Sequence, residues 1–140
     1  KFLAKGFALS KKSLEYYKVL VAEANGSGTL GETLSTPFIG APMVGHTDTF
    51  LTIGMFESEN EALGCLKYIK TKFARTLLGT LKATQHNPRD TWANIPNQDF
   101  TNQSDIDWNK SIHEIDQQLY AKYNLSEDEI EFIEKMIKPM

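Results

Sequence analysis

The side chains of this chain best suited to binding chemistry are six cations with no acid between them. They are Lys67, Lys70, Lys72, Arg75, Lys82 and Arg89. The whole chain has a formal net charge of −3. A positive run on an anionic chain attracts a polyanion. A solvated helix face explains the same run without any partner, because Lys is a good helix former.

A dense group of hydrogen-bond donors follows most of these cations. The candidate residues for contacting base edges are Gln85, His86, Asn87 and Arg89. Gln and Asn side chains pair bidentately with adenine, and Arg pairs with guanine. The candidate phosphate contacts are Lys67, Lys72, Arg75 and Lys82. The pattern therefore predicts a duplex-DNA interface, and the alternative is a polar loop that hydrogen-bonds its own backbone.

The sequence supports a metal site or a catalytic nucleophile less well than it supports a DNA interface. His46, His86 and His113 lie far apart, and none has a Cys or His partner at metal-ligand spacing. The chain has no Gly-x-Ser-x-Gly segment, and Cys65 has no evident base, so we expect it to be a packing residue. The glycine-rich segment 26–31 lacks the Gly-Lys-Ser/Thr ending of a phosphate loop. We expect no catalytic residue, no metal site and no cofactor within this chain.

Acidic residues occur close together in two places. The acids at 127–129 suit the positive end of a helix. Asp105 and Asp107 could hold Mg²⁺ for nuclease chemistry. Such a site also needs a catalytic Lys nearby and a defined strand, which the sequence does not provide. A nuclease subdomain is accordingly an alternative interpretation.

Strands and one long helix are expected to position the candidate residues. Aromatic and β-branched residues predict a strand within 14–24, and residues 49–56 predict a second strand. Because residues 49–56 are apolar on both faces, we expect that strand to be central and covered. Ser58 and Glu61 form a capping box that begins a helix running to about Lys82.

The apolar stripe of this helix sets its orientation. It consists of Ala62, Leu66, Ile69, Phe73 and Leu77. With this stripe packed on the sheet, Arg75 and Lys82 point outward and Lys72 lies nearby. Lys70 borders the stripe. The predicted interface is thus the outer face of the helix together with the segment that follows it.

The C-terminal part is predicted to be helical and acidic. Residues 91–96 read as a short extended segment, with Trp92 in the core, and residues 99–107 as a polar linker. Two amphipathic helices follow. The first buries Ile112, Ile115, Leu119 and Tyr123, and the second buries Ile130, Ile133 and Ile137. Asn124 lies between them at a C-cap position, and Ser126 begins the second helix with a capping box.

Composition and charge bound the remaining possibilities. Residues 1–89 carry 11 Lys and Arg against 7 Asp and Glu, whereas residues 90–140 carry 4 against 11. We predict an α+β fold with a small mixed or antiparallel sheet, one long helix and a C-terminal helical hairpin. The expected division is a domain at 1–100 and the acidic hairpin at 101–140. A single cysteine and no long apolar run favour a cytoplasmic protein without membrane contact. Because the sequence lacks an initiator Met, we expect it to be a piece of a larger polypeptide.

The order of motifs resembles a known family. The segments concerned are KYIKTKFARTLL (67–78), KATQ (82–85), IPNQDF (95–100), SDIDW (104–108), EIDQQLY (114–120), YNLS (123–126), FIE (132–134) and MIKPM (136–140). They resemble the C-terminal region of adenine-specific DNA methyltransferases of bacterial restriction–modification systems, of the single-chain type II or III kind. The strand, long helix and Ile-Pro order is also similar to target-recognition domains of type I specificity subunits.

The resemblance implies target recognition rather than methyl transfer. The Asn/Asp-Pro-Pro-Tyr/Phe motif and the S-adenosylmethionine loop of the family are missing here, and both would lie in an upstream methyltransferase domain. The implied partners are duplex DNA and that domain, while S-adenosylmethionine belongs to the parent protein. Some members of the family also carry an endonuclease in the same chain. An assembly module of a larger enzyme without DNA contact is the competing hypothesis. The acidic hairpin is expected to avoid DNA.

Overall fold

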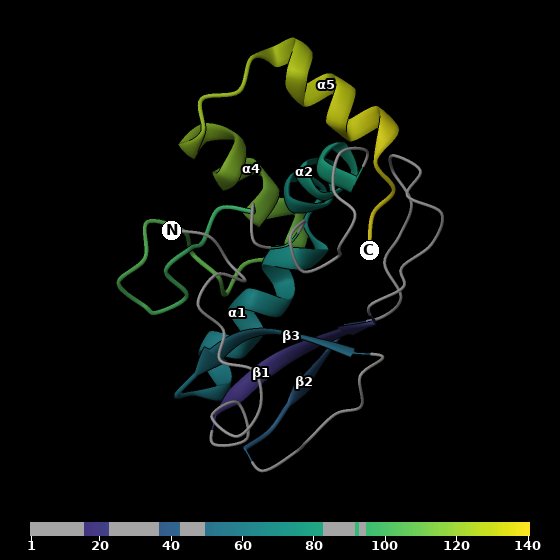
Figure 1. The fold of residues 1–140 in the computed structure, drawn as a ribbon. Helices are drawn as coiled ribbons and strands as arrows, with labels where there is room; N and C mark the ends of the chain where they lie inside the picture. The colour runs from purple at the N-terminus through teal and green to yellow at the C-terminus, as the bar shows by residue number, and fades with distance from the viewer. Residues whose placement is uncertain (1–15, 23–36, 43–49, 83–91, 93–94) are drawn as a thin grey trace.

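The fold combines a small antiparallel sheet with helices, which confirms the predicted α+β class (Figure 1). The computed structural model describes residues 16–22, 37–42, 50–82, 92 and 95–140. The strands are β1 (Tyr17–Ala22), β2 (Phe38–Gly40) and β3 (Phe50–Phe56). The helices are α1 (Glu59–Lys70), α2 (Lys72–Lys82), α4 (Ile112–Lys122) and α5 (Glu127–Met136). None of these helices combines the length and apolar character that a bilayer crossing requires.

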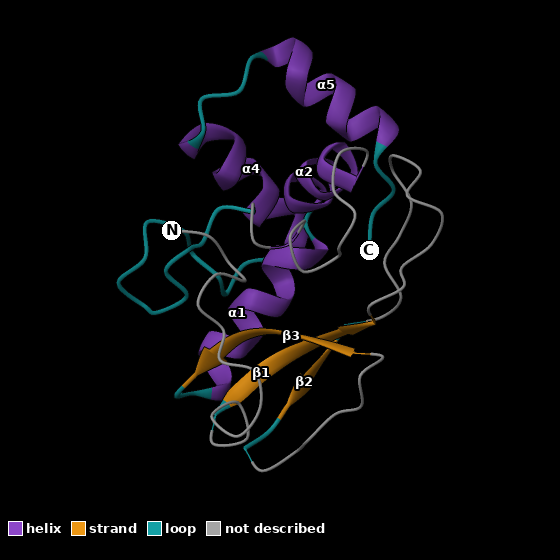
Figure 2. Ribbon diagram, viewed as in Figure 1, coloured by secondary structure: helices purple, strands orange, loops and turns teal. Residues whose placement is uncertain are grey.

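The described sheet has the order β2-β1-β3, and both pairings are antiparallel (Figure 2). Val19 of β1 lies opposite Ile53 of β3, and Val21 lies opposite Leu51. The prediction that residues 49–56 form the central strand is wrong for this described sheet, because β1 is central. The apolar residues on the second face of β3 do not require a central position. One of them, Phe56, packs edge-on against Phe100, outside the sheet, with ring centroids 5.6 Å apart.

The predicted single helix is in fact two helices that meet at Thr71. The Thr71 backbone is extended, with φ −63° and ψ 152°. Its hydroxyl donates to the Tyr68 carbonyl at 2.6 Å and accepts from the Ala74 amide at 3.1 Å. The Asp116 carboxylate, from α4, accepts the Lys72 and Phe73 amides at 3.0 and 2.9 Å. These acceptors satisfy the first amides of α2, which stabilises the break.

The two predicted C-terminal helices form, and both contact α2, but Tyr123, which was predicted to be buried, is 36% exposed. Ile115, Leu119, Ile133 and Ile137 are buried. Asn124 adopts a positive φ of 56° after α4, as its predicted C-cap role requires. The Tyr120 hydroxyl of α4 donates to the Glu134 carboxylate of α5 at 2.9 Å. In Figure 1, α5 lies at the end of the molecule opposite the sheet.

The segment before α4, which was predicted to be a polar linker at 99–107, packs into the core. Phe100, Ile106 and Trp108 are buried in one cluster with Tyr68 and Val19. Gly64 allows this packing, because an added Cβ would lie 3.3 Å from both Phe100 and Trp108. The predicted core positions of Trp92 and Cys65 are confirmed, since both are buried.

Candidate nucleic-acid interface

Lys67 contacts the protein itself rather than presenting a free cation. Its Nζ donates to the backbone carbonyls of Trp108 and Lys110, at 2.9 and 3.2 Å. These carbonyls lie at the end of the segment that precedes α4. The side chain therefore joins α1 to that segment, and two of its three N–H groups are already used.

Lys72 forms an ion pair with the C-terminal helix. Its Nζ lies 2.8 Å from a Glu134 oxygen, and the two side chains are 15% and 29% exposed. Burial alone would raise the pKa of Glu134, but hydrogen bonds from Lys72 and Tyr120 outweigh it and hold that pKa below its usual value. A cation paired in this way offers little attraction to a phosphate, because its charge is already balanced.

Arg75 does not face solvent, so its predicted outward orientation is wrong. The residue is only 4% exposed. Its Nε donates to the Lys70 carbonyl at 3.2 Å, and Nη2 donates to the Lys138 carbonyl. Nη1 has no hydrogen-bond partner within the described part of the chain. Burial lowers the pKa of Arg75, and the nearby Asp116 carboxylate partly opposes this shift.

The break at Thr71 and the C-terminal segment together explain this orientation. Asp116 of α4 is buried, and burial raises its pKa, while the Phe73 and Lys72 amides counteract the shift. Lys72, Arg75, Asp116, Tyr120 and Glu134 thus form one polar group between α2, α4 and α5. We call these residues the junction cluster. Its two cations are balanced by two carboxylates, so it presents no net charge to a polyanion.

The remaining candidates fall at and beyond the end of α2. Lys82 is the last residue of that helix. Gln85, His86, Asn87 and Arg89 lie outside the described residues. The chain on either side is anchored in the core: Leu78 is 3% exposed, Trp92 3% and Ile95 0%. Buried residues therefore occur in the sequence both before and after the donor-rich segment 83–91.

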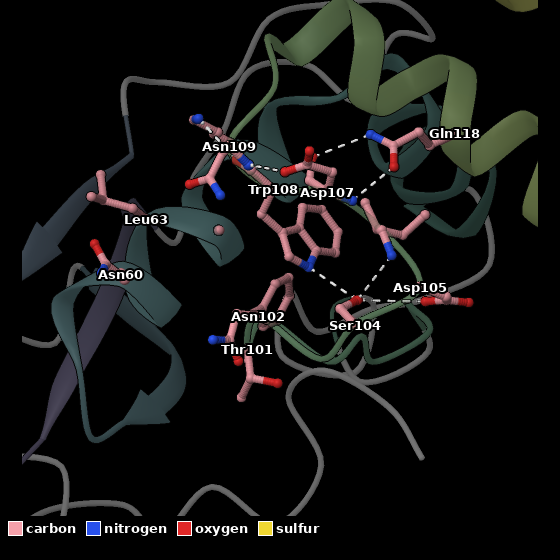
Figure 3. Close-up of a pocket in the computed structure, with 14 residues that line it drawn as sticks. Asn60, Leu63, Thr101, Asn102, Ser104, Asp105, Asp107, Trp108, Asn109 and Gln118 are labelled. Atoms are coloured by element: carbon pink, nitrogen blue, oxygen red, sulfur yellow. Dashed lines mark hydrogen bonds between the residues drawn. The ribbon is translucent and has the colours of Figure 1, made fainter.

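A hollow of about 510 Å³ lies between α1 and the segment before α4 (Figure 3). Its lining includes Asn60, Asn102, Asp105, Asp107 and Trp108. Ser104 accepts hydrogen bonds from the Ile106 amide and the Trp108 indole, at 3.1 and 3.3 Å. Much of this wall is therefore held by internal hydrogen bonds.

The two aspartates proposed for a nuclease are engaged within the protein. Asp105 lies 3.0 Å from Lys122 Nζ in an ion pair. The Asp107 carboxylate accepts the Asn109 amide at 3.0 Å. Within residues 16–22, 37–42, 50–82, 92 and 95–140, no group of three or more His, Cys, Asp or Glu side chains is arranged to hold a metal ion.

Asp116 and Glu134 are site residues that the sequence pattern did not reveal. Each lies on an amphipathic helix, where an acid normally faces water. The one available signal is that Asp116 directly follows the buried Ile115, at the edge of the apolar stripe.

Comparison with known proteins adds no family or relative. No family model, no curated protein and no solved structure matches this chain.

Proposed function

We propose that this chain is the DNA-specificity region of a restriction–modification enzyme. In this proposal the segment 83–91 contacts base edges, and the described helices and sheet form its scaffold. Methyl transfer, with S-adenosylmethionine, and any cleavage belong to other domains of the parent protein. The sequence resemblance supplies the enzyme class, and the donors Gln85, His86, Asn87 and Arg89 supply the chemistry.

The observation that carries the proposal is the burial of residues on both sides of the segment 83–91 in the sequence. Leu78 lies before it, and Trp92 and Ile95 lie after it, all buried in one core cluster. Loops that carry binding specificity are commonly held in this way by a rigid scaffold, because their residues can then vary without cost to the fold. The polar sequence between two buried anchors suits that arrangement.

Fewer cations are available for phosphate contacts than the sequence predicted. Lys67, Lys72 and Arg75 have internal partners, so in this proposal they position α2 and the C-terminal helices. Lys82, at the end of α2, is the phosphate contact that the proposal retains. Phosphate contacts set register without reading sequence, whereas base contacts carry the preference.

Selection from a random duplex library, followed by fluorescence anisotropy at low salt, tests this assignment. We expect Arg89→Ala to relax the preference at one base pair, at a cost of about 1–3 kcal/mol for the preferred site. Lys82→Ala should instead weaken binding on all sequences and reduce the salt dependence. Lys135→Ala, at an exposed position of α5, serves as the control. An unchanged base preference in Arg89→Ala would show that the base-reading assignment is wrong.

A second candidate function is an assembly module without DNA contact. The observation that favours it is the internal pairing of Lys72 and Arg75, which removes two cations from the predicted DNA-binding face. Retention on immobilised DNA that falls steeply with salt would support DNA binding over assembly. Retention that is absent at low salt would support assembly.

A further inference from the structure

The outer face of α5 exposes two large apolar side chains. Phe132 is 49% exposed and Met136 is 46% exposed. They are four positions apart and therefore adjoin on one face of the helix. Ile133, the next residue after Phe132, is buried, and α5 contacts α2. The described part of the fold thus buries Ile133 of α5 and leaves Phe132 and Met136 about half exposed.

Acidic side chains outnumber the single cation of α5, Lys135, which is also exposed. Glu127, Asp128, Glu129 and Glu131 are all exposed on α5. The Glu129 side chain accepts the Ser126 amide as part of the capping box. No ion pair links Asp128 or Glu131 to a cation in the part of the chain that the structure describes. The first-turn acids suit the helix dipole, but Glu131 lies beyond that turn.

We propose that the outer face of α5 binds a basic amphipathic helix of a partner protein. A helix with an apolar strip can cover Phe132 and Met136 while its Lys or Arg side chains pair with Asp128 and Glu131. A nucleic acid or an anionic membrane is disfavoured by the same carboxylates. A second copy of α5 is disfavoured too, because the two acidic faces would repel each other.

This inference names the surface that the assembly role would use, and it rests on that role rather than on DNA reading. Methionine and aromatic side chains suit such a contact, because they bury a large area and adapt to their neighbours. Their exposure also makes them suitable for mutation, since the core residue Ile133 is left in place.

Anisotropy of a fluorescein-labelled helical peptide tests the proposal. The probe has leucines at i, i+3 and i+4 spacing and lysines elsewhere, and its matched control has glutamates in place of the lysines. We expect the protein to bind the lysine peptide and not the glutamate peptide. Phe132→Ser combined with Met136→Ser should weaken binding about tenfold or more. Asp128→Asn combined with Glu131→Gln should weaken it less and reduce its salt dependence.

Leu63→Ser is the matched control, because Leu63 is a 39% exposed apolar residue on α1. It should leave peptide binding unchanged, and circular dichroism should show that each variant is folded. Equal binding of the double serine variant and the unsubstituted protein would overturn the proposal. Absence of binding to the lysine peptide would overturn it as well. Since the assay contains no DNA, either result is separate from the outcome for DNA binding.

Discussion

Asp116 shows at the scale of a single residue how the fold uses a buried charge. Its two carboxylate oxygens accept the Lys72 and Phe73 amides, and its charge lies near Arg75. The position of Asp116 next to Ile115 predicted at most a polar residue at the edge of the helix face. Its partners lie 43 and 44 positions earlier in the chain, so no local pattern predicts them.

We expect Asp116→Asn to destabilise the protein by about 1–3 kcal/mol, measured by urea unfolding. The amide group of Asn can accept one of the two backbone N–H groups, but it turns a donor toward the other. Glu114→Gln is the control, because Glu114 lies exposed on the same helix. Equal stabilities of the two variants would contradict the capping role of Asp116.

Glu134 gives a prediction for pH dependence. Its pKa in the folded protein is held below the usual value of 4.5, mainly because Lys72 and Tyr120 outweigh the effect of burial. A lowered folded pKa stabilises the protein above the unfolded pKa, and that contribution is lost as the pH falls through the folded value. The raised pKa of Asp116 acts in the opposite direction. As the pH falls below about 5, we expect Glu134→Gln to lose less stability than the unsubstituted protein. Glu131→Gln should lose as much stability as the unsubstituted protein over the same range.

At the scale of elements, local signals predicted where α1 and α5 begin. Ser58 and Ser126 form the predicted capping boxes, and Asn124 ends α4 with a positive φ. The division of the predicted long helix at Thr71 was missed, because the apolar stripe continues through Phe73. Thr71 favours a break only once Asp116 supplies acceptors for the amides that follow. The orientation of Arg75 was missed for the same reason.

Thr71→Ala should test that break. We expect a loss of about 1 kcal/mol in the free energy of unfolding, because α2 loses the side-chain oxygen that accepts the Ala74 amide. Thr80→Ala, at an exposed position of α2, should change stability by a few tenths of a kcal/mol at most. A Thr71→Ala protein as stable as the Thr80→Ala protein would mean that Asp116 alone maintains the break.

At the scale of the whole molecule, the basic N-terminal part and the acidic C-terminal part of the chain contact each other within the fold. Lys72 pairs with Glu134, and Arg75 donates to the carbonyl of Lys138. The sequence indicated the opposite signs of the two parts, yet it predicted that they would face different surroundings. Tertiary packing decides this point, since the contacts join residues more than 60 positions apart.

The segment after α5 is therefore expected to matter for stability. Ile137 is 2% exposed, and the Lys138 carbonyl is an acceptor for the buried Arg75. Removal of residues 137–140 should cost several kcal/mol, because it exposes a core position and leaves a buried cation without that acceptor. Thermal unfolding measures the effect. Lys138→Ala keeps the backbone carbonyl and should unfold at nearly the same temperature as the unsubstituted protein.

Leu78 lies before residues 83–91 and Trp92 and Ile95 lie after them, and all three belong to the same core cluster. We therefore expect a protein with residues 83–91 replaced by a different polar stretch of equal length to keep the core that Leu78, Trp92 and Ile95 share. If the proposed function holds, exchange of this segment between two such chains would exchange their base preference while the rest of the sequence stays unchanged.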